Sequence, residues 1–289
     1  AALARAAEHP FNASWSGSAA RTSALFANLK EDLMYDKFAS VYDYFVDWSA
    51  RLSYEMPFIL EQLSQLGEDP YQIKVLDAAC GTGQHAIALA QAGYQVAGAD
   101  LFPQMVQMAD LNASAADQKI RFKTAGFGSI AAAFPNEQFQ AVLCLGNSLP
   151  HVKSSSELQA ALVDFAKLLA PGGLLLIQQR NFDHIMRAKE RHMPPQSHQK
   201  GDEEWLFFRF YDFEPNGLIQ FNILTLHRKK DQRWQVELNT TTIMPILSED
   251  LTKALDNAGF GNIQRFGNLK GDAFDPLTSG DLIVLAKRI

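Results

Sequence analysis

Cysteine is scarce in this 289-residue chain, which holds only Cys80 and Cys144, each inside an apolar stretch. Two isolated cysteines exclude a disulfide framework and a cysteine-based zinc site, and they favour a reducing, cytoplasmic setting. No other set of residues with the spacing of a metal site stands out in the sequence. We therefore predict neither a structural disulfide nor a bound metal ion.

Long apolar runs and basic clusters are missing as well. No apolar run approaches the roughly 20 residues that a membrane helix needs, and the first 30 residues lack the continuous apolar core of a signal peptide. The chain has 26 Lys and Arg against 32 Asp and Glu, and its basic runs are as short as Arg228-Lys229-Lys230. A duplex nucleic acid needs a basic face that displaces counterions. We expect no membrane span, no nucleic-acid partner, and a small molecule as ligand.

The N-terminal part divides into an arm and the start of a domain. Residues 1–33 are rich in alanine and serine, and we interpret them as an N-terminal arm, either flexible or used in assembly, with no assigned chemistry. Residues 34–289 are interpreted as one domain, and nothing in the sequence predicts its oligomeric state. The domain starts with aromatic residues at the helical spacings of three and four, namely Tyr35, Phe38, Tyr42, Phe45 and Trp48. This aromatic stripe packs into a core, covers a ligand, or does both.

Apolar strands alternate with amphipathic helices in the following stretch of the chain. The pattern predicts helices over residues 52–66, 84–92, 103–112 and 155–169, and strands over residues 72–77, 94–99, 120–124, 139–145 and 173–178. Such alternation is typical of parallel βαβ units. It predicts an α/β fold with a doubly wound, Rossmann-like sheet.

The pattern changes after Arg180. Residues 205–213, 218–227 and 234–244 are strand-like and are separated by turn-forming or polar segments such as Pro215-Asn216-Gly217. We interpret residues 204–244 as an antiparallel β insertion after the fifth strand that forms part of the acceptor site. A helix over residues 248–258 and strands over 263–266 and 281–286 then complete a seven-stranded sheet.

Ligands of such sheets bind at the carboxyl ends of the strands. There, Gly81 and Gly83 allow a tight turn that opens a helix, and the free N–H groups of that helix can receive a polar group. Asp100 ends the second strand about 20 residues later, where a carboxylate can accept both hydroxyls of a ribose. These positions predict a nucleoside-bearing cofactor. His85, just inside the helix, is interpreted as a packing residue and not a catalytic one.

The carboxylate of Asp77 narrows the choice of cofactor. At the end of the first strand it would crowd a pyrophosphate, whereas it suits a cationic ammonium group and sulfonium chemistry. A nicotinamide oxidoreductase is the alternative that the glycine spacing leaves open. The chain lacks the Tyr-x-x-x-Lys set, or a similar hydride-transfer set, that such an enzyme needs.

Two levels of resemblance follow from these motifs. Residues 75–83, read with Pro171-Gly172-Gly173 and the closing strands, resemble the class I S-adenosylmethionine-dependent methyltransferases over about residues 35–287. The segments Cys144-Leu145-Gly146-Asn147-Ser148, with His151, and Arg180-Asn181-Phe182-Asp183-His184-Ile185 resemble glycine N-methyltransferase-like enzymes more closely.

This resemblance implies S-adenosyl-L-methionine as cofactor and assigns residues to its parts. It places the methionine portion at Asp77, Ala79 and Gly81, with Gly83 in the same turn, and the ribose at Asp100. It places the adenine between Met105 and Phe127 and the sulfonium near the Leu145 carbonyl. Tyr42 and Arg51 are expected to close over the bound cofactor. It also places Asn147, His151 and Arg180 in the acceptor cavity, with Arg180 as the anchor of a carboxylate. Neither a metal nor a dedicated general base is implied.

The expected function is methyl transfer to a small molecule, favouring the amine of a carboxylate-bearing metabolite such as glycine or sarcosine. The chain departs from the resemblance at Gly126, where many relatives carry a side chain that reads adenine, and at residues 242–244 and 281–283, where the glycine enzyme has tyrosines.

Two alternatives stay open. O- or C-methylation of a larger apolar metabolite would suit Phe207, Phe208, Phe210 and Phe221, and a non-catalytic S-adenosylmethionine-binding module would share the cofactor site. Strand alternation places Phe207, Arg209 and Tyr211 on one face, which is either a roof over the acceptor or one side of a packed sheet.

Overall fold

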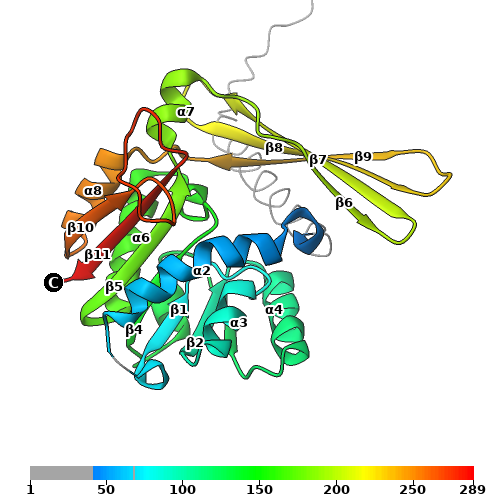
Figure 1. Cartoon of the computed structure of the whole chain (residues 1–289). Helices are drawn as coiled ribbons and strands as arrows, with labels where there is room; N and C mark the ends of the chain where they lie inside the picture. Colours follow the sequence, from blue (N-terminus) through cyan, green and yellow to red (C-terminus); the bar gives the residue numbers. More distant parts are fainter. Residues whose placement is uncertain (1–41, 68) are drawn as a thin grey trace, which may run out of the picture.

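The computed structural model describes residues 42–67 and 69–289. In this part the chain forms a seven-stranded sheet, ordered β10-β11-β5-β4-β1-β2-β3, and a four-stranded sheet, ordered β6-β7-β8-β9 (Figure 1). The predicted arm, residues 1–33, and the aromatic residues Tyr35 and Phe38 lie outside the described residues. Within the described ranges, no helix is both long enough and apolar enough to cross a membrane.

The larger sheet confirms the predicted doubly wound fold. Its strands are β1 (Lys74–Asp77), β2 (Gln95–Asp100), β3 (Arg121–Thr124), β4 (Phe139–Cys144), β5 (Leu169–Arg180), β10 (Phe260–Phe266) and β11 (Asp281–Arg288). The first five run parallel, and β11 inserts antiparallel between β5 and β10. The carboxyl ends of β1, β2, β4 and β5 therefore meet at one edge.

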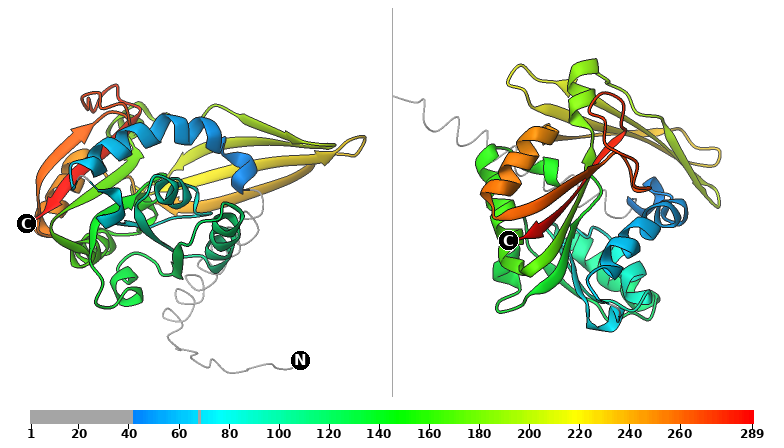
Figure 2. Two further views of the ribbon diagram at one scale, coloured as in Figure 1. Left: turned by 60° about the horizontal axis from the view of Figure 1, so that its bottom comes forward. Right: turned by 60° about the vertical axis from the view of Figure 1, so that its left-hand side comes forward.

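Helices cover both faces of this sheet (Figure 2). They are α2 (Trp48–Ser64), α3 (Gln84–Gln91) and α4 (Pro103–Ala115) on one face, and α5 (Ile130–Ala133), α6 (Ser155–Leu168) and α8 (Ser248–Asn257) on the other. In β4, Val142 packs with α6 and its neighbour Leu143 packs with α2, as alternate residues of a strand buried on both sides must. Burial on both faces explains why the central strands are continuously apolar.

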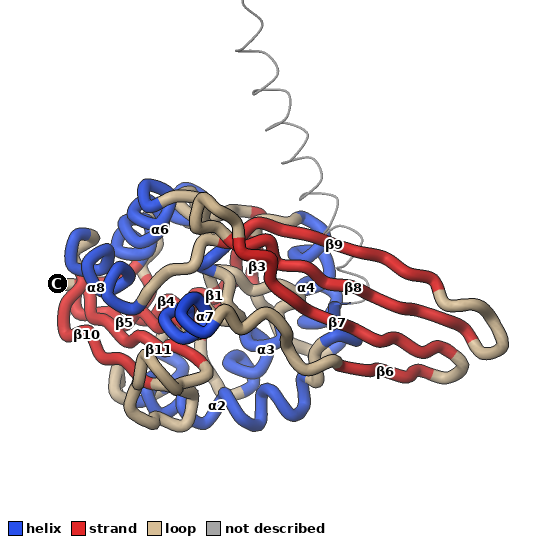
Figure 3. The backbone as a smooth tube through the Cα atoms, turned by 90° about the horizontal axis from the view of Figure 1, so that it is seen from above, coloured by secondary structure: helices blue, strands red, loops and turns tan. Residues whose placement is uncertain are grey.

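The smaller sheet has one strand more than the sequence predicts. Its strands are β6 (Gln196–Lys200), β7 (Glu203–Phe213), β8 (Ile219–Lys229) and β9 (Gln235–Ile243). The segment Gln196–Lys200 is polar throughout, so it has no apolar alternation, and it is a strand because its backbone pairs antiparallel with β7. One end of this sheet lies over the main body while the other projects from it (Figure 3).

Other predicted boundaries also need correction. The aromatic stripe is not one helix: residues 42–45 are helical, the chain bends at Val46, and Asp47 caps the start of α2 by accepting from the Ala50 N–H at 3.0 Å. Strand β5 begins at Leu169 and includes Pro171 and Gly172, which the sequence predicts to precede it, and β10 begins at Phe260. Helix α5 and helix α7 (Phe182–Ala188) were not expected.

Candidate active site

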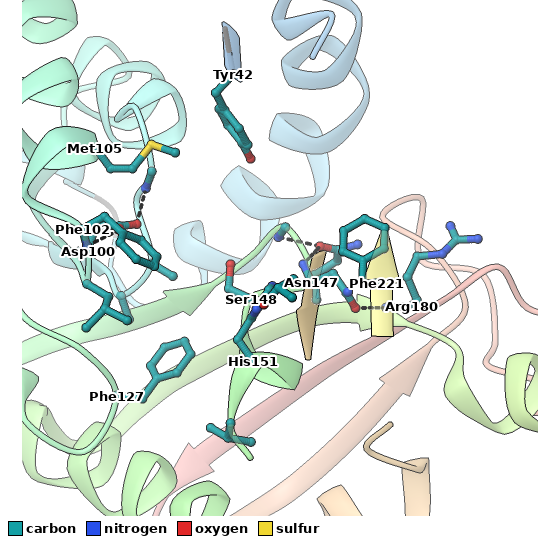
Figure 4. Close-up of a pocket in the computed structure, with 18 of the residues that line it drawn as sticks. Tyr42, Asp100, Phe102, Met105, Phe127, Asn147, Ser148, His151, Arg180 and Phe221 are labelled. Atoms are coloured by element: carbon teal, nitrogen blue, oxygen red, sulfur yellow. Dashed lines mark hydrogen bonds between the residues drawn. The ribbon is translucent and has the colours of Figure 1, made fainter. Parts of the chain in front are cut away.

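A cavity of about 760 Å³ opens at the carboxyl ends of the parallel strands, between them and the smaller sheet (Figure 4). One half contains Tyr42, Asp100, Met105 and Phe127, and the other contains Asn147, His151, Arg180 and Phe221. We call these the strand β2 half and the strand β5 half. All but three of the site residues expected from the sequence line it, namely Tyr42, Arg51, Ala79, Gly81, Asp100, Met105, Phe127, Asn147, His151 and Arg180.

The three remaining residues, Asp77, Gly83 and Leu145, are not among those that line the cavity. Asp77 and Leu145 are buried, and the Leu145 carbonyl accepts a hydrogen bond from the Ser148 hydroxyl at 2.7 Å. Gly83 has a φ of +82° and caps α3, and a Cβ atom there would stand 2.9 Å from the Cβ of Ala109. The structure thus gives Gly83 a role in the turn and its packing, not a place in the cavity.

The glycine turn and Asp100 hold each other in place. The carboxylate of Asp100 accepts from the Gly81 N–H at 2.9 Å and from the Phe102 N–H at 3.0 Å. Burial raises the pKa of Asp100, and these two backbone hydrogen bonds oppose that rise. A carboxylate oxygen can accept more than one hydrogen bond, so this fixed group can still receive hydroxyl donors from a ligand.

Asp77 is a buried carboxylate with an unused oxygen. Its side chain is 1% exposed, and its Oδ1 atom has no hydrogen-bond partner among the described residues. Burial is the main reason that the pKa of Asp77 is raised to about 6. The charge of His85 opposes this rise, and the nearby charge of Asp100 adds to it. A cationic ligand group that reached this carboxylate from the cavity would supply the missing counter-charge.

A second charge network lies under this half of the cavity. Glu55, which is not among the residues expected from the sequence, accepts a hydrogen bond from the Nε of Arg51 at 3.0 Å and lies 2.6 Å from the Nε2 of His85. Burial opposes the charge of Glu55, but the His85 hydrogen bond and the Arg51 charge outweigh it and lower its pKa. His85 also packs edge-on against the Trp48 ring, which agrees with a packing role. The i,i+4 spacing of Arg51 and Glu55 is the signal that could have found this network.

In the strand β5 half, Asn147 positions Arg180. Asn147 has a φ of +61°, and its side-chain oxygen accepts from the Arg180 backbone N–H at 2.8 Å. The Arg180 guanidinium donates to Asp281 at 3.1 Å. Asp183, the partner weighed from the sequence, instead accepts from the Ser248 N–H at 2.9 Å and caps α8. Arg180 therefore enters the cavity already paired with a carboxylate.

The smaller sheet contributes side chains to the same half. Arg209 and Tyr211 on β7 line the cavity together with Phe221, Ile223, Thr241 and Thr242 from β8 and β9. Phe207, expected on the same face, is buried and packs on the Phe45 ring with the centroids 5.3 Å apart. The strand alternation thus predicts a roof correctly for Arg209 and Tyr211, while Phe207 belongs to the core.

Comparison with known proteins places this fold in a defined class. A family model described as a methyltransferase domain matches residues 75–173. The solved structure of an S-adenosylmethionine-dependent methyltransferase from Clostridium acetobutylicum superposes with a TM-score of 0.70 at 18% identity, covering 88% of this chain and 98% of that one. The S-adenosylmethionine-bound amino pentose methyltransferase CalS10 from Micromonospora echinaspora gives 0.65 at 17% identity, covering 97% and 100%. The fold is that of this class of transferase.

Sequence relatives narrow the class. A glycine/sarcosine N-methyltransferase of Parasynechococcus marenigrum is 34% identical over 255 residues, which are 83% of this chain and 80% of that protein. One from Aphanothece halophytica is 32% identical over 199 residues, covering 66% and 73%. The chain belongs to the class I S-adenosylmethionine-dependent methyltransferases and is similar to their glycine N-methyltransferase-like members. It is an enzyme that uses S-adenosylmethionine and acts on a small-molecule acceptor.

The buried charge of Asp77 predicts a pH-dependent stability. Because its pKa is raised from 3.8 to about 6, the folded state holds this proton more tightly than the unfolded state. The native state therefore loses stability as pH rises from about 4 to 6, by an amount on the order of 2–3 kcal/mol, and the loss is complete above that window. In the absence of cofactor, D77N should be the more stable protein at pH 8 and lose this advantage at pH 4.

Urea unfolding of both proteins across this pH range measures the difference. D110N, which changes an exposed carboxylate on α4, serves as the matched control and should follow the wild-type profile. Parallel stability profiles for the wild type and D77N would contradict the assignment of a buried charge to Asp77.

Proposed function

We propose that this enzyme methylates the nitrogen of a small amino acid, with glycine or sarcosine as acceptor. The observation that carries the proposal is the cavity itself, which joins a carboxylate-bearing half at β2 to an arginine-bearing half at β5 and β7. The first half suits a cationic cofactor, and the second suits an acceptor with an anionic group. The names of the two sequence relatives support the same acceptor class.

The cofactor would occupy the strand β2 half. We assign its ammonium to Asp77, its ribose hydroxyls to Asp100, and its adenine to the space between Met105 and Phe127. At Gly126 a Cβ atom would stand 2.8 Å from the Leu101 Cδ1, so a side chain that reads adenine would fit there only if the Leu101 side chain moved. Adenine would then be recognised there by backbone groups, with Tyr42 and Arg51 closing the site from α2 and the turn before it.

The chemistry asks the protein mainly for position. The bound cofactor supplies a methyl carbon made electrophilic by its sulfonium, and the acceptor nitrogen forms the new C–N bond as the C–S bond breaks. The nitrogen must be neutral and in line with the methyl group, about 3 Å away. Asn147 and Gln178 fix the loop at the end of β4, since Gln178 Oε1 accepts from the Gly146 N–H at 2.7 Å. That loop then presents His151 and backbone carbonyl groups to the acceptor.

The aromatic residues that suited a larger apolar acceptor are mostly elsewhere. Phe207 is in the core and Phe208 is exposed. Phe210 lies under Arg191, whose guanidinium carbon is 5.3 Å from the centroid of the Phe210 ring. Of that group only Phe221 lines the cavity. The cavity therefore provides less aromatic surface for a larger apolar acceptor than the sequence suggests.

Acceptor profiling tests the proposal directly. Release of S-adenosylhomocysteine should be fastest with glycine or sarcosine in a panel that also contains dimethylglycine, phenols and hydroxy acids. Turnover confined to the phenols would refute an amino-acid acceptor, and silence across the panel with intact cofactor binding would refute it as well.

Arg180→Lys tests the anchoring of the acceptor. Lysine keeps the charge but loses the planar fork, so the KM for glycine should rise about tenfold or more. The affinity for S-adenosylhomocysteine, measured by titration calorimetry, should stay within about twofold. R121K, which alters a surface arginine paired with Glu137, is the matched control. Equal losses of acceptor and cofactor affinity would contradict the anchor role.

Asp100→Asn tests the ribose site. The amide keeps the shape of the side chain but removes the charge that strengthens its hydrogen bonds, so affinity for S-adenosylhomocysteine should fall about 10- to 100-fold. The KM for the acceptor at saturating cofactor should change little. D110N again provides the control, and unchanged cofactor affinity in D100N would remove Asp100 from the site.

A further inference from the structure

Arg209 is the arginine of the cavity whose charge has no acidic partner among the described residues. Arg51 pairs with Glu55 and Arg180 pairs with Asp281. Arg209 makes no such pair within residues 42–67 and 69–289: its guanidinium carbon lies 4.9 Å from the centroid of the Phe45 ring, and its buried Nε, like that of Arg180, has no hydrogen-bond acceptor. A ring face is a weak substitute for a carboxylate, so this cation is poised for an anion.

The surroundings of Arg209 reinforce this need. Burial and the positive charge of Arg180 both lower the pKa of Arg209. A guanidinium nevertheless stays protonated in proteins. The electrostatic cost of burying this cation beside Arg180 is therefore offset by an anionic ligand and not by loss of a proton. An anion between these two arginines would offset their repulsion.

Tyr211 adds a neutral donor at the same place. It lies two residues along β7, on the same face as Arg209, and also lines the cavity. Its side chain is buried, its hydroxyl has no hydrogen-bond partner among the described residues, and burial raises its pKa to about 12. The hydroxyl therefore stays protonated and can donate to an anion. Together the two side chains offer the fork and the extra donor that a carboxylate accepts.

The two halves of the cavity have opposite electrostatic character. Asp100 lies at the β2 end, with Asp77 buried at the end of the neighbouring strand β1, and Arg209 lies at the other end beside Arg180, which pairs with Asp281. An α-amino acid placed along this axis directs its carboxylate to the roof and its nitrogen to the cofactor. The opposite orientation would set the carboxylate against two acidic groups.

We propose that Arg209 is a specificity-determining residue that, with Tyr211, binds the acceptor's carboxylate from the roof and selects short amino carboxylates over neutral amines. The inference rests on the proposed amino-acid acceptor and deepens it. Arg180 completes the site from the floor, but its pairing with Asp281 leaves Arg209 as the source of uncompensated charge.

The first experiment compares glycine with glycinamide, which has the same size and no charge on its carbonyl end. In R209Q the KM for glycine should rise on the order of 10- to 100-fold while that for glycinamide changes less than about threefold. R209K should recover part of the loss because it restores the charge without the fork. R228Q, which alters an arginine of the same sheet paired with Glu204 and outside the cavity, should resemble the wild type.

A purely structural role for Arg209 gives a different pattern. In that case R209Q and R209K would lose S-adenosylhomocysteine affinity and glycine turnover together, with glycine and glycinamide affected alike, and the inference would be overturned. An unchanged KM for glycine in R209Q would overturn it too.

A second measurement does not depend on turnover. Acetate should raise the melting temperature of the protein saturated with S-adenosylhomocysteine, whereas acetamide should not, and R209Q should lose the acetate effect. If no amino acid is methylated but the acetate effect depends on Arg209, the roof site stands and the proposed acceptor fails. If glycine is methylated but acetate acts equally on the wild type and R209Q, the acceptor stands and the roof site fails.

Discussion

The burial of negative charge at the ends of β1 and β2 governs the arrangement of the cavity. Asp77 and Asp100 are both shielded from water, and the charge of Asp100 adds to the rise in the pKa of Asp77. The protein offsets the free-energy cost of these buried charges only in part. Backbone N–H groups donate to the Asp100 carboxylate, and the charge of His85 acts on Asp77. The remaining deficit is positive charge, which the ammonium group of the cofactor would supply in the proposed arrangement. Affinity for the cofactor and instability of the empty site would then have the same electrostatic cause.

The sequence predicts those parts of the molecule that follow from local pattern. The central strands are recognisable because both their faces are buried, which leaves uninterrupted apolar runs such as that of β4. Strand β6 is invisible for the opposite reason, since Gln196–Lys200 is polar and is held by its neighbour's backbone. The positions of Asp77, Asp100 and Arg180 follow from the topology, because parallel strands deliver their ends to one edge.

Partnerships are harder to predict than positions. The choice of Asp281 over Asp183 as the partner of Arg180 depends on β11 lying beside β5, a pairing across about a hundred residues that no local pattern contains. The same holds for Glu55, whose His85 contact joins two helices. Alternation along β7 does place Arg209 on the cavity face, but only the assembled roof shows that its charge has no acidic partner in the described ranges.

The short helical turn over residues 42–45 contacts both halves of the cavity. The Tyr42 ring lies over Gly81, 4.0 Å from where a Cβ atom would stand, while Phe45 lies beneath Arg209 and against Phe207. These two rings are three residues apart on the same helical segment. With both ligands bound as proposed, a displacement of residues 42–45 would uncover the cofactor and remove Phe45 from beneath Arg209 at the same time. Entry and departure of the two ligands would then depend on one segment of the chain.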